Sequence, residues 1–206
     1  MGSTPEGSQV KLILASASAS RAAMLSAAGI EFAAVPADID ESPAKREFHA
    51  AGRGAAACAM ALAEAKAQAV AGLHPDDVII GADQILVAAG EWFDKPDNLD
   101  EAGAQLRRLA GRTHRPDTAA CAVRGGDVLW RANAAPELTM RRFGESFLAA
   151  YISAEGDALL GSVGAYRLEG RGVQLFERIE GDHFAILGLP LLELLGFLRG
   201  YGLAVE

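Results

Sequence analysis

The chain has 206 residues, of which 50% are hydrophobic and 22% charged, so it can bury a sizeable core as one domain or two closely joined lobes. Its formal net charge of −8 disfavours broad binding to the phosphate backbone of DNA or RNA, although a local basic pocket is compatible with it. The apolar run at 184–192 ends well short of the roughly 20 residues that cross a bilayer, which predicts a soluble protein with no membrane partner.

Residues 1–10 are polar and lack the basic-then-apolar layout of a secretory signal. We therefore expect a disordered leader followed by a single domain over residues 11–206. Cys58 and Cys121 have no partners at metal-ligand spacing. We interpret both as reduced thiols of the core, which favours the cytoplasm as the compartment.

Short apolar runs alternate with helical patterns through the first half of the chain. In chain order, the expected elements are a strand at 11–15, a helix that follows a Ser-rich turn and ends near Gly29, a strand at 32–36, an Ala-rich helix at about 53–70 and a strand at 78–87. An acidic loop with Asp38, Asp40 and Glu41 is expected before the Ala-rich helix. Asp83 interrupts the otherwise apolar strand that follows it.

Caps and turn residues define the elements of the second half. Asn98 and Glu101 have capping-box spacing, which predicts the start of a helix that runs through Leu109. The elements expected after it are extended segments at 113–123 and 128–140 joined by a hairpin turn at 124–127, a short helix at 145–153, a strand at 173–179 and a final helix opened by Pro190. Strands that alternate with helices around a central hairpin predict an α/β fold with a mixed sheet.

The turn at 16–21, Ser-Ala-Ser-Ala-Ser-Arg, brings hydroxyl groups, backbone amides and a guanidinium to the start of a helix. The helix dipole and the free N–H groups favour an anion there, so a phosphate cradle is one interpretation. Capping and solvation of the turn are the other, and the residues alone leave both open. The spacing matches neither a P-loop nor the Gly-x-Gly-x-x-Gly dinucleotide turn.

Two acidic and two basic residues are further candidates. Glu41 and Asp83 lie beside apolar strands, and two carboxylates can hold a divalent ion that bridges phosphate oxygens. A loop Glu is usually only solvated, whereas an Asp in the middle of a strand is costlier to bury. Lys66 and Lys95 could bind a polyphosphate, with an ordinary surface position as the alternative.

The sequence disfavours zinc hydrolysis and acyl-enzyme chemistry. Its four histidines lack the spacing of a zinc site: His49, His74, His114 and His183. No Gly-x-Ser-x-Gly elbow offers an acyl-enzyme nucleophile. Water activated by a metal ion is therefore the simplest nucleophile.

Ordered motifs from about Leu12 to Arg199 carry a family resemblance. The matching segments are 14–18 (Leu-Ala-Ser-Ala-Ser) with Arg21, 35–41, 63–66 (Ala-Glu-Ala-Lys), 81–84 (Gly-Ala-Asp-Gln), 95–96, 111–114, 164–166, 168–170, 177–182 and 188–190. In these segments the chain resembles the Maf-like nucleoside triphosphate pyrophosphatases. The resemblance implies an elongated mixed β-sheet flanked by helices, with two lobes around a nucleotide cleft, and a homodimer.

The resemblance also implies an activity, namely hydrolysis of a nucleoside triphosphate between its α and β phosphates. The products would be the monophosphate and pyrophosphate, and the cofactor a divalent metal cation, Mg or Mn. Carried onto matching positions, the residues that would hold the triphosphate are Ser16, Ser18, Arg21, Lys66 and Lys95. Glu41 and Asp83 would bind the metal, and Asp83 would act as general base.

Departures from the family pattern fall where the base is chosen. Ala19 replaces the usual Pro, and Ser20 matches neither the Arg of the branch that prefers dTTP and UTP nor the Trp frequent in the 7-methyl-GTP branch. Gln84 and Glu169 resemble the 7-methyl-GTP branch. A carboxylate at 169 can accept hydrogen bonds from guanine N1–H and the amino group and favours a cationic methylated ring. The same carboxylate could also accept from the amino group of cytosine.

Two other functions are compatible with nucleotide binding. The family is also named for inhibition of septum formation, so a regulator that binds nucleotide without turnover is the alternative. A nucleotidyltransferase is the third possibility. The retained acidic and cationic candidates favour the hydrolase, because a sensor alone does not need a water-orienting Asp83. The sequence leaves open whether hydrolysis would clear modified nucleotides or regulate division.

Overall fold

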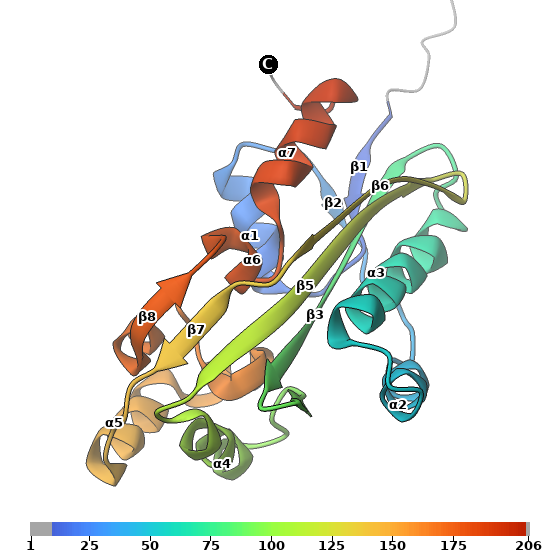
Figure 1. Ribbon diagram of the computed structural model, residues 1–206. Coiled ribbons are helices and arrows are strands. Elements are labelled where there is room, and N and C mark those ends of the chain that lie inside the picture. The colour runs from blue at the N-terminus through green and yellow to red at the C-terminus, as the bar shows by residue number, and fades with distance from the viewer. Residues whose placement is uncertain (1–9, 205–206) are drawn as a thin grey trace, which may run out of the picture.

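The computed structural model describes residues 10–204, which form one mixed β-sheet with helices on both faces (Figure 1). Except for Val10, the expected leader at residues 1–10 lies outside the described residues. The strands are β1 (Leu12–Leu14), β2 (Ala33–Ala34), β3 (Val78–Ala88), β4 (Glu91–Phe93), β5 (Thr113–Arg124), β6 (Asp127–Ala134), β7 (Glu137–Met140) and β8 (Phe176–Glu180). The α-helices are α1 (Ala19–Ala27), α2 (Ser42–Ala50), α3 (Ala55–Ala71), α4 (Leu99–Leu109), α5 (Glu145–Glu155), α6 (His183–Ile186) and α7 (Leu191–Gly200). The 3-10 helices are η1 (Gly156–Gly161), η2 (Val163–Ala165) and η3 (Arg171–Leu175).

The sheet combines parallel and antiparallel pairs. Its strand order is β2-β1-β3-β5-β7-β8, with β4 paired to β3 and β6 paired to β5. β1 is parallel to β2 and β3, whereas β3 is antiparallel to β5. Helical crossovers join the parallel strands and a tight turn joins β5 to β6, as each kind of pairing requires. The predicted α/β class with a mixed sheet is confirmed.

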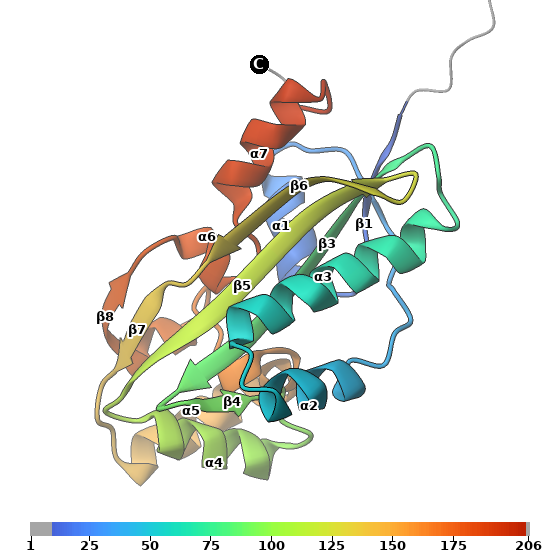
Figure 2. The same ribbon diagram turned by 45° about the vertical axis from the view of Figure 1, so that its right-hand side comes forward.

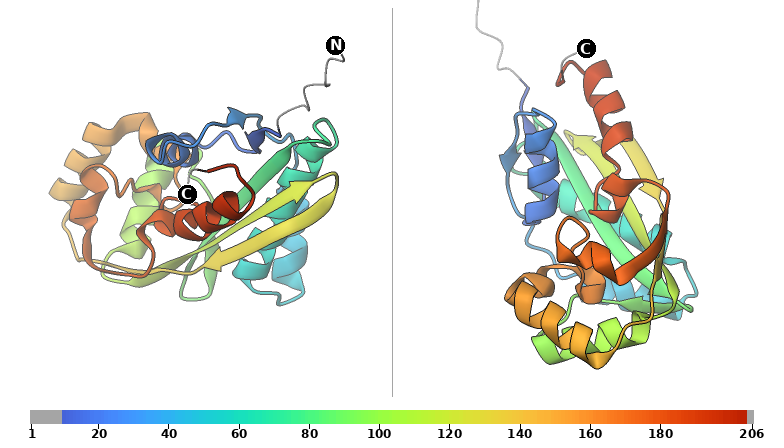
Figure 3. Two further views of the ribbon diagram at one scale, coloured as in Figure 1. Left: turned by 90° about the horizontal axis from the view of Figure 1, so that it is seen from above. Right: turned by 90° about the vertical axis from the view of Figure 1, so that its left-hand side faces the viewer.

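Helices cover the two faces of the sheet differently. Figure 2 shows α2 and α3 on one face, while α1, α6 and α7 lie behind it. Figure 3 shows α1 and α7 together at one end of the molecule, with α4 and α5 at the opposite end. Because side chains alternate along a strand, β3 contributes side chains to the cores on both faces of the sheet. Ile79 and Ile85 pack in the core beneath α3, and Ile80 and Ala82 pack in the core beneath α1 and α7.

The Ala-rich helix α3 approaches β3 unusually closely at Gly81. A Cβ atom on Gly81 would overlap the carbonyl oxygen of Ala63 and lie 2.9 Å from the Cβ of Ala67. Both alanines are fully buried. Small side chains on the helix and a glycine on the strand therefore let the two backbones come together. This approach sets how far a long side chain on α3 reaches across β3.

On the side opposite β5, β3 has no strand partner among the described residues over part of its length. β1 pairs with Val78–Ile80 and β4 pairs with Leu86–Ala88, both on the side of β3 away from β5. Between these two pairings, residues 81–85 have β5 as their only strand partner within residues 10–204. Asp83 and Gln84 thus lie in a stretch of β3 that, among the described strands, has no neighbour opposite β5.

Most of the expected elements are confirmed, with boundaries shifted by a few residues. The hairpin turn is tight, and the extended segment expected at 128–140 is divided into β6 and β7 around Pro136. The N-cap prediction holds, because Asn98 Oδ1 accepts a hydrogen bond from Glu101 N–H at 2.9 Å. Pro190 is the N-cap residue of α7.

Two expectations about elements are wrong. The region after the acidic loop contains a helix, α2, whose polar sequence buries only Phe48 and so shows no apolar stripe. The strand expected at 173–179 begins only at Phe176, since η3 occupies Arg171–Leu175. The chain folds back on itself there, and a Cβ on Gly172 would overlap the carbonyl group of Arg167. Helix α6, with four residues, is a further element that was not predicted.

The two cysteines are buried and free, as expected of core thiols. Burial raises the pKa of Cys58 to about 11 and that of Cys121 to about 12, so both thiols are protonated at neutral pH. Within residues 10–204, no helix combines the length and the apolar character that crossing a membrane requires.

Candidate active site

The Ser-rich turn leads from the end of β1 into α1 and is organised by its own side chains. Ser18 is the N-cap residue, and its Oγ accepts from the backbone N–H of Arg21 at 3.4 Å. Ser16 Oγ accepts from the N–H of Ser18 at 3.1 Å and from Arg21 Nη1 at 3.2 Å. The capping interpretation of Ser18 is thus correct, and the neighbouring Ser16 orients the guanidinium of Arg21.

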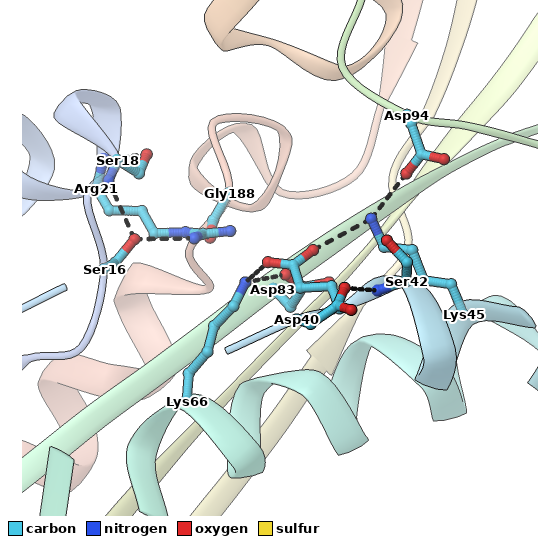
Figure 4. Close-up of polar contacts among 11 residues, drawn as sticks. Ser16, Ser18, Arg21, Asp40, Ser42, Lys45, Lys66, Asp83, Asp94 and Gly188 are labelled. Atoms are coloured by element: carbon cyan, nitrogen blue, oxygen red, sulfur yellow. Dashed lines mark hydrogen bonds and ion pairs between the residues drawn. The ribbon is translucent and has the colours of Figure 1, made fainter. Parts of the chain in front are cut away.

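Arg21 is held in place from two sides. Its Nε donates to the carbonyl oxygen of Gly188 at 2.7 Å, in the loop between α6 and α7, and its side chain is buried. Burial lowers the pKa of Arg21, against the effect of the negative charges of Asp83 and Glu41. A guanidinium keeps its proton even so. Figure 4 shows Arg21 extending from the turn toward the neighbourhood of Lys66 and Asp83.

Lys66 joins the two predicted carboxylates. Its Nζ lies 2.6 Å from Glu41 Oε1 and 2.5 Å from Asp83 Oδ1. Figure 4 shows Lys66 beside Asp83. Lys66 projects from α3 and Asp83 from the middle of β3, and Glu41 is the N-cap residue of α2. The close packing of α3 on Gly81 brings the lysine within reach of Asp83. Three residues from three elements therefore form one compact charged cluster.

Asp83 is the most buried member of this cluster, at 5% exposure. Its Oδ1 pairs with Lys66, while its Oδ2 is buried and has no hydrogen-bond partner within residues 10–204. Burial raises the pKa of Asp83, and Glu41 adds to the rise, whereas the charge of Lys66 acts against it. A carboxylate with a raised pKa and one unused oxygen is suited to accept a proton or bind a cation.

Glu41 is held by a second lysine that the sequence did not single out. Lys45 lies one turn further along α2, and its Nζ is 3.1 Å from Glu41 Oε2 and 2.7 Å from Asp94 Oδ1. Burial acts to raise the pKa of Glu41, but the hydrogen bonds and charges of Lys66 and Lys45 outweigh it, so the net pKa is lowered. Glu41 is therefore a carboxylate with both oxygens engaged. Lys45 also links it to the loop that carries Lys95.

A cleft of about 800 Å³ opens on the α1 side of the sheet. Among its lining residues are Ser18, Ser20, Arg21, Gln84, Lys95, Tyr166, Arg167 and Glu169, which come from α1, β3, the loop after β4 and the segment after η2. This volume is within the range of small-molecule sites. Glu41, Lys66 and Asp83 belong to the other face of the sheet and do not line the cleft. The structure thus separates the predicted residues into a charged cluster and a cleft, with Arg21 close to both.

Gln84 is fixed in the floor of the cleft. Its Nε2 lies 2.7 Å from Thr118 Oγ1 and 2.9 Å from the carbonyl oxygen of Ala185. Thr118 donates its own hydroxyl proton to the same carbonyl at 2.8 Å. Since the acceptors gather around Nε2, the amide orientation is unambiguous and Oε1 is the atom left to accept from a ligand. The short helix α6, absent from the predicted elements, supplies this support.

Two charged residues mark different parts of the cleft. Desolvation and the positive charge of Arg21 lower the pKa of Lys95, which identifies Lys95 as a neighbour of the Ser-rich turn. Glu169 is exposed, and its Oε1 lies 3.4 Å from Arg167 Nε. Arg167 was not among the predicted site residues, because a single arginine carries no signal in the sequence.

A buried histidine stands behind the cleft. His114 Nε2 lies 3.2 Å from the hydroxyl oxygen of Tyr166, and Phe176 packs against both rings. Burial lowers the pKa of His114 to about 4, so the ring is neutral at pH 7. The sequence offered His114 as a residue without zinc-site spacing and as part of the matching segment 111–114, without a role. The structure assigns it to the support of Tyr166.

The carboxylate pair fits a divalent cation that also has ligands from a substrate. No three His, Cys, Asp or Glu side chains come together as a complete metal cage in the described part of the chain. Asp83 Oδ2 is nevertheless buried and unpartnered, and Glu41 lies across Lys66 from it. Mg²⁺ is commonly held by one or two carboxylates together with phosphate oxygens and water. The residues present therefore suit such an ion.

Comparison with known proteins gives one family and several full-length relatives. A family model described as "Maf-like protein" matches residues 11–201. The chain is 53% identical to a "Nucleoside triphosphate pyrophosphatase" of Granulibacter bethesdensis, over 92% of this chain and 96% of that protein. It is 47% identical to a "7-methyl-GTP pyrophosphatase" of Rhizobium etli, over 93% and 96%, and 46% identical to a protein of the same name from Brucella abortus, over 92% and 96%.

Proposed function

The chain belongs to the family of Maf-like proteins, and from this membership and the site geometry we propose that it is a nucleoside triphosphate pyrophosphatase. The enzyme hydrolyses the anhydride bond between the α and β phosphates and releases a nucleoside monophosphate and pyrophosphate. Two relatives that align over nearly their whole length are named "Nucleoside triphosphate pyrophosphatase", which supports the proposal. The substrate is a free nucleotide and not a nucleic acid, in keeping with the net charge of −8.

One observation supports this function more than any other. The ammonium group of Lys66 joins Glu41 and Asp83 beside an oriented Arg21, where β3 has none of the described strands as a neighbour opposite β5. Phosphoryl transfer depends on positioning and on charge stabilisation of nonbridging oxygens. Cations that surround two carboxylates, with Arg21 close to both this cluster and the nucleotide-sized cleft on the other face of the sheet, provide both.

In the proposed mechanism, the residues of the turn and the lysines hold the triphosphate. Ser16 and Ser18 orient Arg21, whose guanidinium contacts phosphate oxygens together with Lys66 and Lys95. Asp83 orients the attacking water and accepts its proton at the unpartnered Oδ2. A divalent cation, Mg or Mn, held by Glu41 and Asp83 would neutralise charge on the phosphate groups. Glu41 keeps its negative charge because its pKa is lowered.

We infer that the preferred base is a modified purine, with 7-methyl-GTP favoured. Gln84 Oε1 is a fixed acceptor in the cleft, and the Glu169 carboxylate can accept from N1–H and the amino group of guanine. Ser20 lies in the same cleft and is small enough to leave room for a purine. Two relatives named "7-methyl-GTP pyrophosphatase" at 46–47% identity support this preference.

The test is pyrophosphate release with Mg or Mn across 7-methyl-GTP, the common ribonucleotides and deoxyribonucleotides, and other modified triphosphates. We expect stoichiometric monophosphate and pyrophosphate, with the highest kcat/KM for 7-methyl-GTP. Release of a diphosphate and orthophosphate would contradict cleavage between the α and β phosphates. Tight binding of nucleotides without any turnover would support the alternative, a nucleotide-binding regulator of septum formation.

The oligomeric state and the cellular compartment are further parts of the proposed function. We expect a homodimer in the cytoplasm that clears modified nucleotides. Size-exclusion chromatography with light scattering at several concentrations measures the oligomeric state. A single species with the mass of one chain would contradict the dimer without affecting the proposed activity.

A further inference from the structure

Glu155 is an acidic residue in an unfavourable place. It is the last residue of α5, where the helix dipole is negative, and its side chain is only 8% exposed. A carboxylate at a helix C-terminus is disfavoured by the dipole, and burial adds a desolvation cost. Neither the proposed catalytic cluster nor the packing of the core requires a charge at this position.

The ion-pair partner of Glu155 leads directly into the cleft. Arg167 Nη1 lies 3.4 Å from Glu155 Oε2, and Arg167 Nε lies 3.4 Å from Glu169 Oε1. Arg167 and Glu169 line the cleft, whereas Glu155 lies behind them and does not. One guanidinium is thus shared between a buried carboxylate and the carboxylate proposed to read the base.

The local backbone keeps these three groups together. The N–H of Arg167 donates to the hydroxyl oxygen of Tyr151 on α5 at 3.3 Å, which ties the segment to the helix that carries Glu155. A Cβ on Gly170 would be 3.6 Å from Glu155 Oε1, and one on Gly172 would overlap the carbonyl group of Arg167. Glycines at both positions let the chain turn tightly against Glu155.

The cleft is negatively charged around Glu169 and positively charged at the Ser-rich turn. Two carboxylates and one guanidinium leave a net charge of −1 around Glu169. At the Ser-rich turn, Arg21 and Lys95 line the same cleft with positive charge. Without Glu155, Arg167 would cancel the charge of Glu169 and the base end would be neutral. A ligand that matches this polarity is anionic at its phosphates and cationic at its base.

We propose that Glu155 determines specificity, by keeping the base end of the cleft negative so that it selects a purine nucleotide whose base carries a positive charge over its neutral counterpart. Arg167 and Glu155 act through Glu169 and the local field, and neither is a catalytic residue. The inference rests on the proposed function and adds to it a physical basis for discrimination. An N7-alkylated guanine has the required charge, and an unmodified guanine does not.

The experiment separates the charge of the base from its size. Its substrates are 7-methyl-GTP and 7-methyl-7-deaza-GTP, which carries the methyl group on carbon and is neutral. The measured quantity is the ratio of kcat/KM for the cationic over the neutral nucleotide. Variants are Glu155→Gln, Arg167→Gln and the double variant. Glu145→Gln is the matched control, because Glu145 is an exposed carboxylate at the other end of the same helix.

The expected shifts have opposite signs. Glu155→Gln should lower the ratio about 5-fold, because a charge several ångströms away in a partly solvated cleft is worth roughly this factor. Arg167→Gln should raise it, the double variant should return it close to the wild-type value, and Glu145→Gln should leave it unchanged. The wild-type ratio should also fall as salt is raised from 0.05 to 0.5 M, mainly through screening of Glu169, because the buried Glu155 is screened less.

Other results would overturn the proposal. An unchanged ratio in Glu155→Gln, or shifts of the same sign in both single variants, would show that these residues only shape the loop. If Glu155→Gln does not fold, Arg167→Gln and the salt dependence still decide the question. If no nucleotide is hydrolysed, the proposed function fails instead, and the ratio of the two Kd values tests the charge selection independently.

Discussion

At the scale of single residues, Asp83 carries two conflicting requirements. As the proposed general base it must be ionised to accept a proton, yet it is buried with one oxygen unpartnered, and its pKa is raised. We expect Asp83→Asn to retain nucleotide binding while kcat falls by about 10² to 10⁴, the usual contribution of a positioned general base. Single-turnover kinetics and equilibrium binding measure the two effects separately. Near-normal turnover would remove Asp83 from this role.

The same substitution should affect stability in the opposite direction. A carboxyl group whose pKa is raised in the folded state stabilises the fold below its unfolded pKa, and this stabilisation is lost as the pH rises through the folded value. The ionised side chain of Asp83 therefore lowers the free energy of unfolding at neutral pH. We expect Asp83→Asn to unfold at a higher temperature than the wild type at pH 7.5, with a smaller difference at pH 4. A lower unfolding temperature at pH 7.5 would show that the pair with Lys66 outweighs burial.

His114 predicts the behaviour of the fold in acid. Its pKa is lowered from 6.5 to about 4 by burial, so the stability it contributes is complete above pH 6.5 and is lost as the pH falls toward 4. By pH 5 the loss from this group is about 2 kcal/mol, at 1.36 kcal/mol per pH unit. Urea unfolding of the wild type and of His114→Gln between pH 7.5 and 5 measures it. Equal pH dependence in both proteins would contradict this assignment.

Predictability differs sharply among the site residues. Ser16, Arg21, Glu41, Lys66 and Asp83 could be found because each belongs to a local motif in a recognisable order. Three other contributors could not, because their role depends only on what the fold places beside them: Lys45 between two carboxylates, and Arg167 and Glu155 beside Glu169. His114 lies in the matching segment 111–114, but its contact with Tyr166 could not be predicted from that segment. No spacing along the chain encodes such contacts.

At the scale of elements, the site depends on how closely α3 packs on β3. Gly81→Ala would drive a methyl group into the backbone of α3 at Ala63. We expect a loss of about 3 kcal/mol, as for severe overpacking, or failure to fold. Gly196→Ala, on the exposed side of α7 with nothing within 4 Å of the new methyl, should instead stabilise the protein by about 0.5 to 1 kcal/mol. Denaturant unfolding compares them, and similar effects at both sites would contradict the close approach.

Elements were predictable where hydrophobic period and turn chemistry agree. The buried strand at β3, the hairpin of β5 and β6, and the cap of α4 at Asn98 all carry such signals. Helix α2 carries no such signal, because its sequence is polar and Phe48 is its only buried residue. The start of β8 was misjudged because the turn through Gly170 and Gly172 is set by its contact with Arg167. Tertiary contact, not local propensity, decides both cases.

At the scale of the whole molecule, the fold does not need a metal ion to balance its acidic cluster. Lys66 pairs with both Glu41 and Asp83, and Lys45 also pairs with Glu41, so two lysines face the two carboxylates. We therefore expect EDTA to abolish pyrophosphate release while the unfolding temperature changes by less than about 2 °C, a fraction of a kcal/mol for a chain of this length. Activity should return with added Mg or Mn. Full activity in EDTA would exclude the cation from the reaction, and a large fall in unfolding temperature would make it structural.

The alternation of side chains along β3 has a consequence for how such proteins can change. Asp83 and Gln84 are neighbours in the chain, yet one faces α3 and the other faces α6 across the thickness of the sheet. In the proposed assignment Gln84 contributes to the choice of nucleotide and Asp83 to proton transfer, so substitutions that change the first need not disturb the second. Relatives could therefore differ in nucleotide preference through substitutions on the Gln84 face of β3, while the residues on the Asp83 face stay the same.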